Sequence, residues 1–251
     1  MSVRMNIGPK MNEPSPIQSL KIFWDIDGTL LNTKGAAAEV FASTVSKFAG
    51  QNVKINRKDL SGYTDYEIAE SLLESIGIKA SIEDIKHILN EYVTNLPKCL
   101  EARNTEIIGC VRETLDKLSQ LSCIELAIGT GNCQAGAKAK LEFVNLINYF
   151  NHKNIFCATE FIWNRDLVLK KANESLEINQ TGVVVGDSVK DILSAKRYDL
   201  PIISVATGVH SVSDLIKHNP DCILESNWNY KEFCVAIQDI LSTRSLYIID
   251  L

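Results

Sequence analysis

Short runs of apolar residues alternate along this chain with longer segments whose apolar residues recur at helical spacing. The apolar runs predict strands at 21–24, 124–128, 155–158, 182–185 and 202–205. The periodic segments predict helices at 36–49, 66–76, 82–96, 109–121, 132–147 and 188–198. Strands that alternate with helices are typical of a parallel sheet covered on both faces. We therefore expect an α/β protein.

The first two predicted strands are separated by about 100 residues, which is more chain than a single crossover helix needs. The helical patterns in this interval follow one another without a convincing strand between them. We therefore expect an all-helical insertion at 33–103. It would divide an α/β core into two parts, at 19–32 and 104–251.

Residues 1–18 hold three of the six prolines and no apolar segment of the kind that a signal peptide needs, so we expect a disordered leader there. Elsewhere, no apolar run approaches the roughly 18 residues that cross a bilayer. The seven cysteines include no CxxC pair, which favours free thiols in a reducing compartment over a zinc site or a redox motif. These features predict a cytoplasmic protein that has no membrane partner.

The charge balance directs attention to one acidic loop. The chain has 26 Lys and Arg against 31 Asp and Glu, a formal net charge of −5, and this excludes a broad nucleic-acid-binding face. Two of the acidic residues, Asp25 and Asp27, directly follow the first predicted strand and precede Gly28 and Thr29. Close carboxylates repel each other, which raises a pKa or recruits a hard cation such as Mg²⁺.

The ends of two later strands also carry polar residues. Thr130, Gly131 and Asn132 precede a predicted helix, where they suit an anion, although a plain helix N-cap explains them about as well. Asp187 follows a later strand and Asp191 lies four residues on, which suits either a pair of site carboxylates or an ordinary helix cap. Because ligands of parallel α/β sheets bind at the carboxyl ends of the strands, we expect these residues to meet.

In this order, the motifs resemble those of the haloacid dehalogenase superfamily, in its phosphoglycolate phosphatase-like branch with a helical cap. Segment 25–30, Asp-Ile-Asp-Gly-Thr-Leu, matches the DxDGT signature of the family, Thr130 stands at its Ser/Thr position, and 186–191 matches its acidic motif. The insertion at 33–103 lies where such proteins carry a C1-type cap. The resemblance extends over about 21–222. It implies a Rossmann-like, doubly wound parallel sheet core.

One motif departs from the family pattern. The family usually has a lysine as its third motif, and the best match in this chain is Arg165. Some phosphatases of this kind use arginine there, so the role can survive. Lys170 and Lys171, a turn further along the helix, are the alternatives.

The resemblance implies a role for each matched residue. Asp25 would attack phosphorus to form an aspartyl-phosphate, with Asp27 as general acid and base, and Thr130 and Arg165 would hold the phosphoryl oxygens. The implied substrate-binding residues are Gly28, Thr29, Gly131, Asn132 and, in the cap loop, Gly62, Tyr63 and Thr64. The implied cofactor is Mg²⁺, with ligands from Asp25, Asp27 (through its backbone carbonyl), Asp187 and Asp191.

An acid at position 27 favours phosphoryl transfer over dehalogenation, because a halide leaves without a proton. The resemblance therefore implies a Mg²⁺-dependent phosphatase that acts on a small phosphorylated metabolite, as a monomer or a weak dimer. A phosphomutase and a catalytically inactive regulatory module that binds phosphate or Mg²⁺ are the alternatives.

Overall fold

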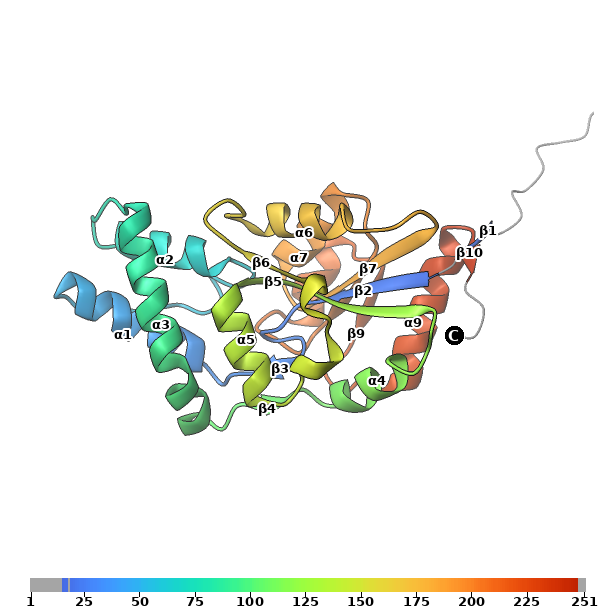
Figure 1. Ribbon diagram of the computed structural model, residues 1–251, viewed down its shortest axis with the longest axis horizontal. Coiled ribbons are helices and arrows are strands. Elements are labelled where there is room, and N and C mark those ends of the chain that lie inside the picture. The colour runs from blue at the N-terminus through green and yellow to red at the C-terminus, as the bar shows by residue number, and fades with distance from the viewer. Residues whose placement is uncertain (1–14, 18, 248–251) are drawn as a thin grey trace, which may run out of the picture.

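The centre of the protein is a six-stranded sheet in which all neighbouring strands run parallel (Figure 1). The computed structural model describes residues 15–17 and 19–247, so most of the predicted leader, 1–14 and 18, lies outside the described residues. Across the sheet, the strands are β6 (Ile155–Ala158), β5 (Ile124–Cys133), β2 (Ser19–Trp24), β7 (Gln180–Gly186), β8 (Ile202–Val205) and β9 (Cys222–Leu224). All five predicted strands lie in this sheet.

The order of these strands is that of a doubly wound fold. Numbered along the chain, the six strands lie in the order 3-2-1-4-5-6 across the sheet. The order reverses between β2 and β7, which pair from Ser19↔Gln180 to Trp24↔Val185. Ligands of such sheets bind in the crevice at this reversal, beyond the carboxyl ends of the strands. The predicted fold class is confirmed, and residues that directly follow β2 and β7 meet at the crevice.

The sheet lies between two helical layers (Figure 1), and the side chains of β2 alternate between them. The covering helices are α4 (Val111–Leu118), α5 (Gln134–Phe143) and α9 (Tyr230–Thr243) on one face, and α6 (Arg165–Asn173) and α7 (Val189–Arg197) on the other. Leu20, Ile22 and Trp24 pack on the first face, where Trp24 stacks on Phe233 at 5.1 Å between ring centroids. Phe23 packs on the second face. Burial on both faces explains why the strand is apolar without alternation.

Three helices form a separate layer at one end of the sheet, at the left of Figure 1. They are α1 (Ala36–Ala49), α2 (Asp65–Glu74) and α3 (Ile82–Ala102). These helices enclose their own buried cluster, in which Phe41 stacks on Tyr92 with 3.9 Å between ring centroids. α3 continues past its predicted end at 96 through Pro97, because the next turn buries Leu100 completely.

Short strands join this helical layer to the core. β3 (Leu31–Asn32), where the chain enters the layer, pairs antiparallel with β4 (Glu106–Ile107), where the chain leaves it. At the far end of the molecule, β1 (Ser15–Pro16) pairs in parallel with β10 (Leu246–Tyr247), so the described end of the predicted leader forms a strand. The remaining elements are α8 (Val212–Leu215) and the 3₁₀ helices η1 (Ile147–Tyr149), η2 (His152–Asn154) and η3 (Ile216–His218).

Several boundaries differ from those predicted. β5 runs to Cys133 rather than ending at 128, because its pairing with β6 resumes at Cys133↔Ala158 after an irregular stretch. The helix predicted at 132–147 therefore begins only at Gln134. All seven cysteines are free, two of them buried and five partly buried. Within the described part of the chain, none of the helices combines the length and apolar character needed to cross a bilayer.

Candidate active site

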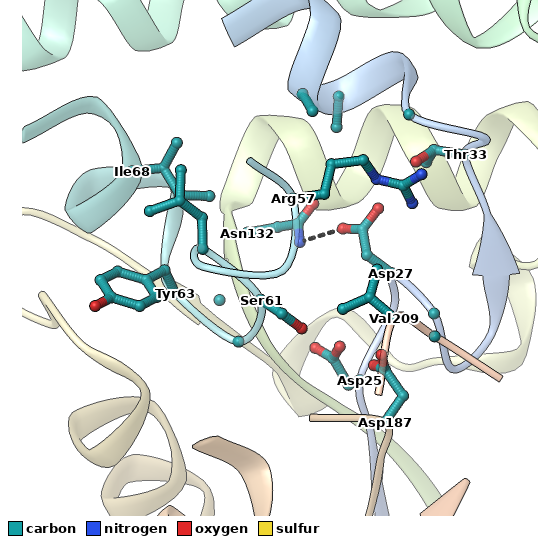
Figure 2. A pocket seen from close by; sticks show the side chains of 18 of the residues that line it. Asp25, Asp27, Thr33, Arg57, Ser61, Tyr63, Ile68, Asn132, Asp187 and Val209 are labelled. Carbon is teal, nitrogen blue, oxygen red and sulfur yellow. Dashed lines mark hydrogen bonds between the residues drawn. The ribbon is translucent and has the colours of Figure 1, made fainter. Parts of the chain in front are cut away.

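The adjacent ends of β2 and β7 bring three aspartates together. Asp25 directly follows β2, and its N–H donates to the carbonyl oxygen of Val185 at 2.9 Å. Asp187 and Asp191 follow β7, in the loop before α7 and in the first turn of that helix. Carboxylate oxygens of the three aspartates lie within 4.8 Å of one another, and Asp25 and Asp187 lie side by side in Figure 2.

Burial and repulsion from neighbouring carboxylates make ionisation of Asp25 and Asp187 unfavourable. The pKa of Asp25 is raised to about 7, first by burial; the Arg165 guanidinium opposes the shift, and Asp191 and Asp27 add to it. The pKa of Asp187 is raised well above its usual range, first by burial and then by Asp191 and Asp25. A divalent cation would remove this repulsion, and carboxylate oxygens are ligands that Mg²⁺ prefers. The donor set therefore fits the Mg²⁺ that the sequence predicts.

Two glycines allow the backbone to pack against Asp187. Gly28 has φ of +81°, and a Cβ at this position would lie 2.5 Å from Oδ2 of Asp187. A Cβ on Gly208 would lie 1.6 Å from the same oxygen. The Thr29 hydroxyl donates to Oδ1 of Asp187 at 3.3 Å. Of the two residues predicted here to bind substrate, Gly28 lines the cavity of the site, whereas Thr29 is fully buried beneath it.

Asp191 takes part both in its helix and in the site. Its Oδ2 accepts hydrogen bonds from the N–H and the hydroxyl of Ser188, at 3.0 and 2.7 Å, which forms a capping box at the start of α7. Its Oδ1 faces Arg165 at 2.5 Å. Asp191 is therefore both a helix cap, through Oδ2, and a carboxylate of the site, through Oδ1.

Arg165 is a buried cation between two of these aspartates. It begins α6, is 2% exposed, and its guanidinium nitrogens lie 3.2 Å from Oδ1 of Asp25 and 2.5 Å from Oδ1 of Asp191. Burial opposes the charge of Arg165, but Asp191 and Asp25 outweigh that effect and raise its pKa. A buried, charged arginine with a planar set of donors is suited to the oxygens of a phosphoryl group.

The two alternative lysines for this motif lie away from the site. Lys170 and Lys171 pair with Glu174 at 4.0 and 3.1 Å, and more than half of each lysine side chain is exposed, 53% and 59%. Neither lysine lines the cavity. Of the three candidates for this motif, Arg165, Lys170 and Lys171, it is Arg165 that contacts Asp25.

The segment after Gly129 supplies the opposite side of the site. A hydrogen bond from Thr130 lowers the pKa of Asp25, although it does not offset the effect of burial. Gly131 and Asn132 line the cavity, while Thr130 is fully buried behind them. The Asn132 amide donates to Oδ2 of Asp27 at 2.8 Å, as the dashed line in Figure 2 shows.

A buried lysine completes this side of the site, and the sequence analysis missed it. Lys140 of α5 is 1% exposed, and its Nζ lies 2.5 Å from Oδ2 of Asp27 and 2.5 Å from Oδ1 of Asn132. Burial opposes its charge, but Asp27 and Asp65 outweigh that effect and raise the pKa of Lys140. The available signal was its spacing within the predicted helix, three residues after Ala137 and four before Val144, both of which are buried in the structure. A lysine is rarely buried there without a partner.

The predicted cap loop packs directly on the core. A Cβ on Gly131 would come within 2.7 Å of the Tyr63 carbonyl oxygen. Gly62 has φ of +77°, and its Cβ would lie 2.4 Å from Oγ of Ser188. The Lys190 ammonium lies 3.4 Å from the centroid of the Tyr63 ring. Gly62 and Tyr63 line the cavity, so this loop covers the site.

Thr64 and Asp65, at the end of this loop, both contact the core, and Asp65 also lines the cavity. The Thr64 hydroxyl caps α2 and donates to the Trp163 carbonyl oxygen at 2.5 Å. Oδ2 of Asp65 accepts a hydrogen bond from the N–H of Cys133 at 2.8 Å. The pKa of Asp65 is raised to about 6, first by burial and against the effect of Lys140. The resemblance places Asp65 at the end of the cap loop, but nothing in the sequence indicates its contact with Cys133.

A cavity of about 540 Å³ lies between the aspartates and the helical layer. Its cap side is mixed, with Phe41 and Ile68 among the apolar lining residues. The charged lining residues of this side are Lys34, which pairs with Glu106, Asp65 and Arg57. Figure 2 shows the Arg57 guanidinium directed toward Thr33 and the Asp27 carboxylate. Among the described residues, none forms an ion pair or hydrogen bond with Arg57. The cavity volume is in the range of small-molecule sites.

Known proteins with a similar sequence carry out phosphate chemistry according to their names. The sequence model of a family described as haloacid dehalogenase-like hydrolase matches residues 22–205. A phosphoglycolate phosphatase from Agrobacterium fabrum is 26% identical over 229 residues, which cover 84% of this chain and 89% of that protein. A candidate pyrophosphatase, PpaX, from Caldanaerobacter subterraneus is 26% identical over 211 residues, which cover 82% and 90%.

Solved structures share the arrangement of core and helical layer. A candidate beta-phosphoglucomutase from Bacteroides vulgatus superposes with a TM-score of 0.70 at 17% identity. The superposition covers 90% of this chain and 91% of that chain. At this level of identity the similarity shows the fold alone.

Proposed function

Because the chain belongs to the haloacid dehalogenase-like hydrolase family, we propose that it is a Mg²⁺-dependent phosphatase for a small phosphate monoester, with an aspartyl-phosphate intermediate on Asp25. The observation that carries the proposal is that Asp25 contacts the buried Arg165 and lies within 4.8 Å of carboxylate oxygens of Asp187 and Asp191. A nucleophile, an anion-binding cation and a set of metal ligands thus surround one point. Phosphoryl transfer needs positioning and charge stabilisation above all.

The chemistry proceeds in two displacements. In the first, the Asp25 carboxylate attacks phosphorus, and the leaving oxygen keeps the electrons of the broken bond and takes a proton from Asp27. In the second, Asp27 takes a proton from a water whose oxygen attacks phosphorus, and Asp25 is released. The Gly131 N–H and Arg165 stabilise the phosphoryl oxygens in both displacements, and Thr130, which lies behind the cavity and hydrogen-bonds to Asp25, supports the nucleophile.

Asp25, Asp187 and Asp191, with the backbone carbonyl of Asp27, would hold the Mg²⁺. When bound, the ion supplies positive charge that offsets the phosphoryl oxygens and keeps Asp25 ionised. The raised pKa values of Asp25 and Asp187 support this assignment, because they reflect burial and then repulsion between carboxylates, and a bound cation would offset both.

The Arg57 guanidinium favours binding of a substrate that carries a second anionic group. This cation lines the cavity opposite the aspartates and has no partner among the described residues. The names of two relatives, a phosphoglycolate phosphatase and a candidate pyrophosphatase, refer to substrates that carry a second negative group beside the reacting phosphoryl group. We therefore propose phosphoglycolate, or a small monoester with similar charge, as the substrate class.

Release of inorganic phosphate from phosphoglycolate and from 4-nitrophenyl phosphate, with MgCl₂ and with EDTA, tests the proposal. We expect activity only with Mg²⁺, and a loss of at least about 1,000-fold in Asp25→Asn. Asp239→Asn, an exposed change on α9, is the matched control. Activity that survives Asp25→Asn would refute the nucleophile.

Two other outcomes would identify the alternatives. Transfer of the phosphoryl group within a sugar phosphate, without phosphate release, would indicate a mutase, and Mg²⁺ binding without turnover would indicate a regulatory module. For the substrate class, Arg57→Ala should raise the KM for phosphoglycolate about tenfold and leave that for 4-nitrophenyl phosphate unchanged. An equal effect on both substrates would refute the role of Arg57.

A further inference from the structure

Three polar side chains form a closed triangle beside the cavity. Lys140 lies 2.5 Å from Oδ2 of Asp27 and 2.5 Å from Oδ1 of Asn132, and the Asn132 amide donates to the same Oδ2 of Asp27 at 2.8 Å. Lys140 is 1% exposed and Asn132 is 6% exposed. Two buried donors, one from α5 and one from β5, therefore hold a single oxygen of Asp27.

The other carboxyl oxygen of Asp27 is in the opposite situation. Oδ1 is buried and has no hydrogen-bond partner among the residues that the structure describes. A buried acceptor without a partner is unfavourable, and such exceptions in folded proteins need a specific explanation. Asp27 lines the cavity, so the unpaired oxygen belongs to a residue that faces the substrate space.

We propose that Lys140 is a positioning residue for Asp27: together with Asn132 it fixes Oδ2, and it thereby assigns proton transfer to Oδ1. The inference rests on the proposed function. The proton on Oδ1 passes to the leaving oxygen as the bond from that oxygen to phosphorus breaks. The ionised Oδ1 then takes a proton from the attacking water, whose oxygen bonds to phosphorus as the bond to Asp25 breaks.

This assignment is consistent with both protonation states of Asp27. A protonated carboxyl group still has one acceptor oxygen, so Oδ2 can accept from Lys140 and Asn132 throughout the cycle. The two buried cations of the site then have separate tasks. Arg165 contacts the nucleophile, Asp25, whereas Lys140 contacts the acid and base, Asp27.

The test compares two similar aryl phosphates, phenyl phosphate and 4-nitrophenyl phosphate, whose leaving groups differ in basicity. 4-Nitrophenolate leaves readily without a proton, whereas phenolate depends on one. For Lys140→Met we expect kcat/KM to fall about 100-fold on phenyl phosphate and less than tenfold on 4-nitrophenyl phosphate. Lys140→Arg, which keeps a charged donor, should recover part of the loss on phenyl phosphate. Lys138→Met, an exposed change on the same helix, is the matched control and should match wild type.

An equal loss on both substrates would overturn the inference, because a structural role or a direct contact with phosphate affects both alike. In an Asp27→Asn background, Lys140→Met should have no further effect on phenyl phosphate, and additive losses would also overturn it. If Lys140→Met does not fold, Asn132→Ala gives the same comparison, since it removes the other donor to Oδ2. Wild-type protein that hydrolyses neither aryl phosphate nor phosphoglycolate would refute the proposed function, and the inference with it.

Discussion

The backbone of Tyr63 lies directly on Gly131, where a Cβ would come within 2.7 Å of the Tyr63 carbonyl oxygen. The helical layer thus meets the core at the strand end that carries Thr130 and Asn132. The neighbouring Gly62 approaches Ser188, at the start of α7, still more closely, since its Cβ would lie 2.4 Å from Oγ of Ser188. Closure of the helical layer over the site therefore depends on two glycines. Gly131 belongs to the core, and Gly62 belongs to the helical layer.

Gly62→Ala should weaken this closure, and the chain offers a matched control. Gly62 and Gly77 have nearly the same φ, +77° and +78°, but a Cβ on Gly77 would meet nothing within 4 Å. Both changes should destabilise the protein by about 1 kcal/mol through backbone strain. Only Gly62→Ala should lower kcat/KM, by about tenfold or more, because its Cβ separates the loop from Ser188. Equal kinetic effects of the two changes, measured alongside urea unfolding, would contradict this account.

Arg165→Met should abolish most activity, because it removes the positive charge that lies between Asp25 and Asp191. We expect kcat/KM to fall at least about 100-fold, with Arg165→Lys intermediate, since lysine restores charge but not the planar set of donors. Lys171→Met on the same helix should have no effect, because that ammonium group pairs with Glu174 at the surface. Steady-state kinetics of the three variants would test this. A loss in Lys171→Met equal to that in Arg165→Met would reassign the motif.

The sequence predicted the sheet well because buried parallel strands are continuous apolar runs. It missed β9, whose three residues are too few to form a pattern, and it ended β5 too early. Gly129 to Asn132 have turn-like composition, yet they continue the strand, because pairing with β6 resumes at Cys133. Local propensity was overridden here by long-range pairing, which spacing along the chain does not reveal.

For the site, the motifs predicted which residues gather at the carboxyl ends of the strands. The residues missed were those that act from other elements. Lys140 reaches Asp27 across 113 positions of sequence, and Asp65 reaches the N–H of Cys133 across 68. Contacts of this kind depend on how α5 and α2 pack against the sheet, so only the structure identifies them.

Metal affinity should depend on pH near neutrality. Without a cation, burial and repulsion raise the pKa of Asp25 to about 7 and that of Asp187 well above its usual range, so protons compete with the metal. We expect Mg²⁺ to bind at least about tenfold more weakly at pH 6 than at pH 8, and binding at pH 7 to release protons. Calorimetry in two buffers of different ionisation enthalpy measures that release. Affinity that does not change with pH would contradict the assignment of Asp25 and Asp187 as ligands.

Asp65 should make folding stability depend on pH in a direction opposite to that of a salt-bridged aspartate. Its folded pKa is about 6, above the ordinary value of 3.8, so the folded state binds this proton more tightly than the unfolded state. The favourable contribution is complete below pH 3.8 and is lost as the pH rises through 6. Asp65→Asn keeps an oxygen that can accept from Cys133 but cannot titrate.

Urea unfolding of wild type and Asp65→Asn at pH 5, 6 and 7.5 gives the measurement. Between pH 5 and 7.5, the free energy of unfolding of wild type should fall relative to that of the variant by about 1 kcal/mol. Asp239→Asn, at the exposed surface of α9, should show no such trend against wild type. A difference between wild type and Asp65→Asn that stays constant over this range would mean that Asp65 is already ionised at pH 5. Asp65 would then accept the hydrogen bond from the N–H of Cys133 as a charged carboxylate over the whole range from pH 5 to 7.5.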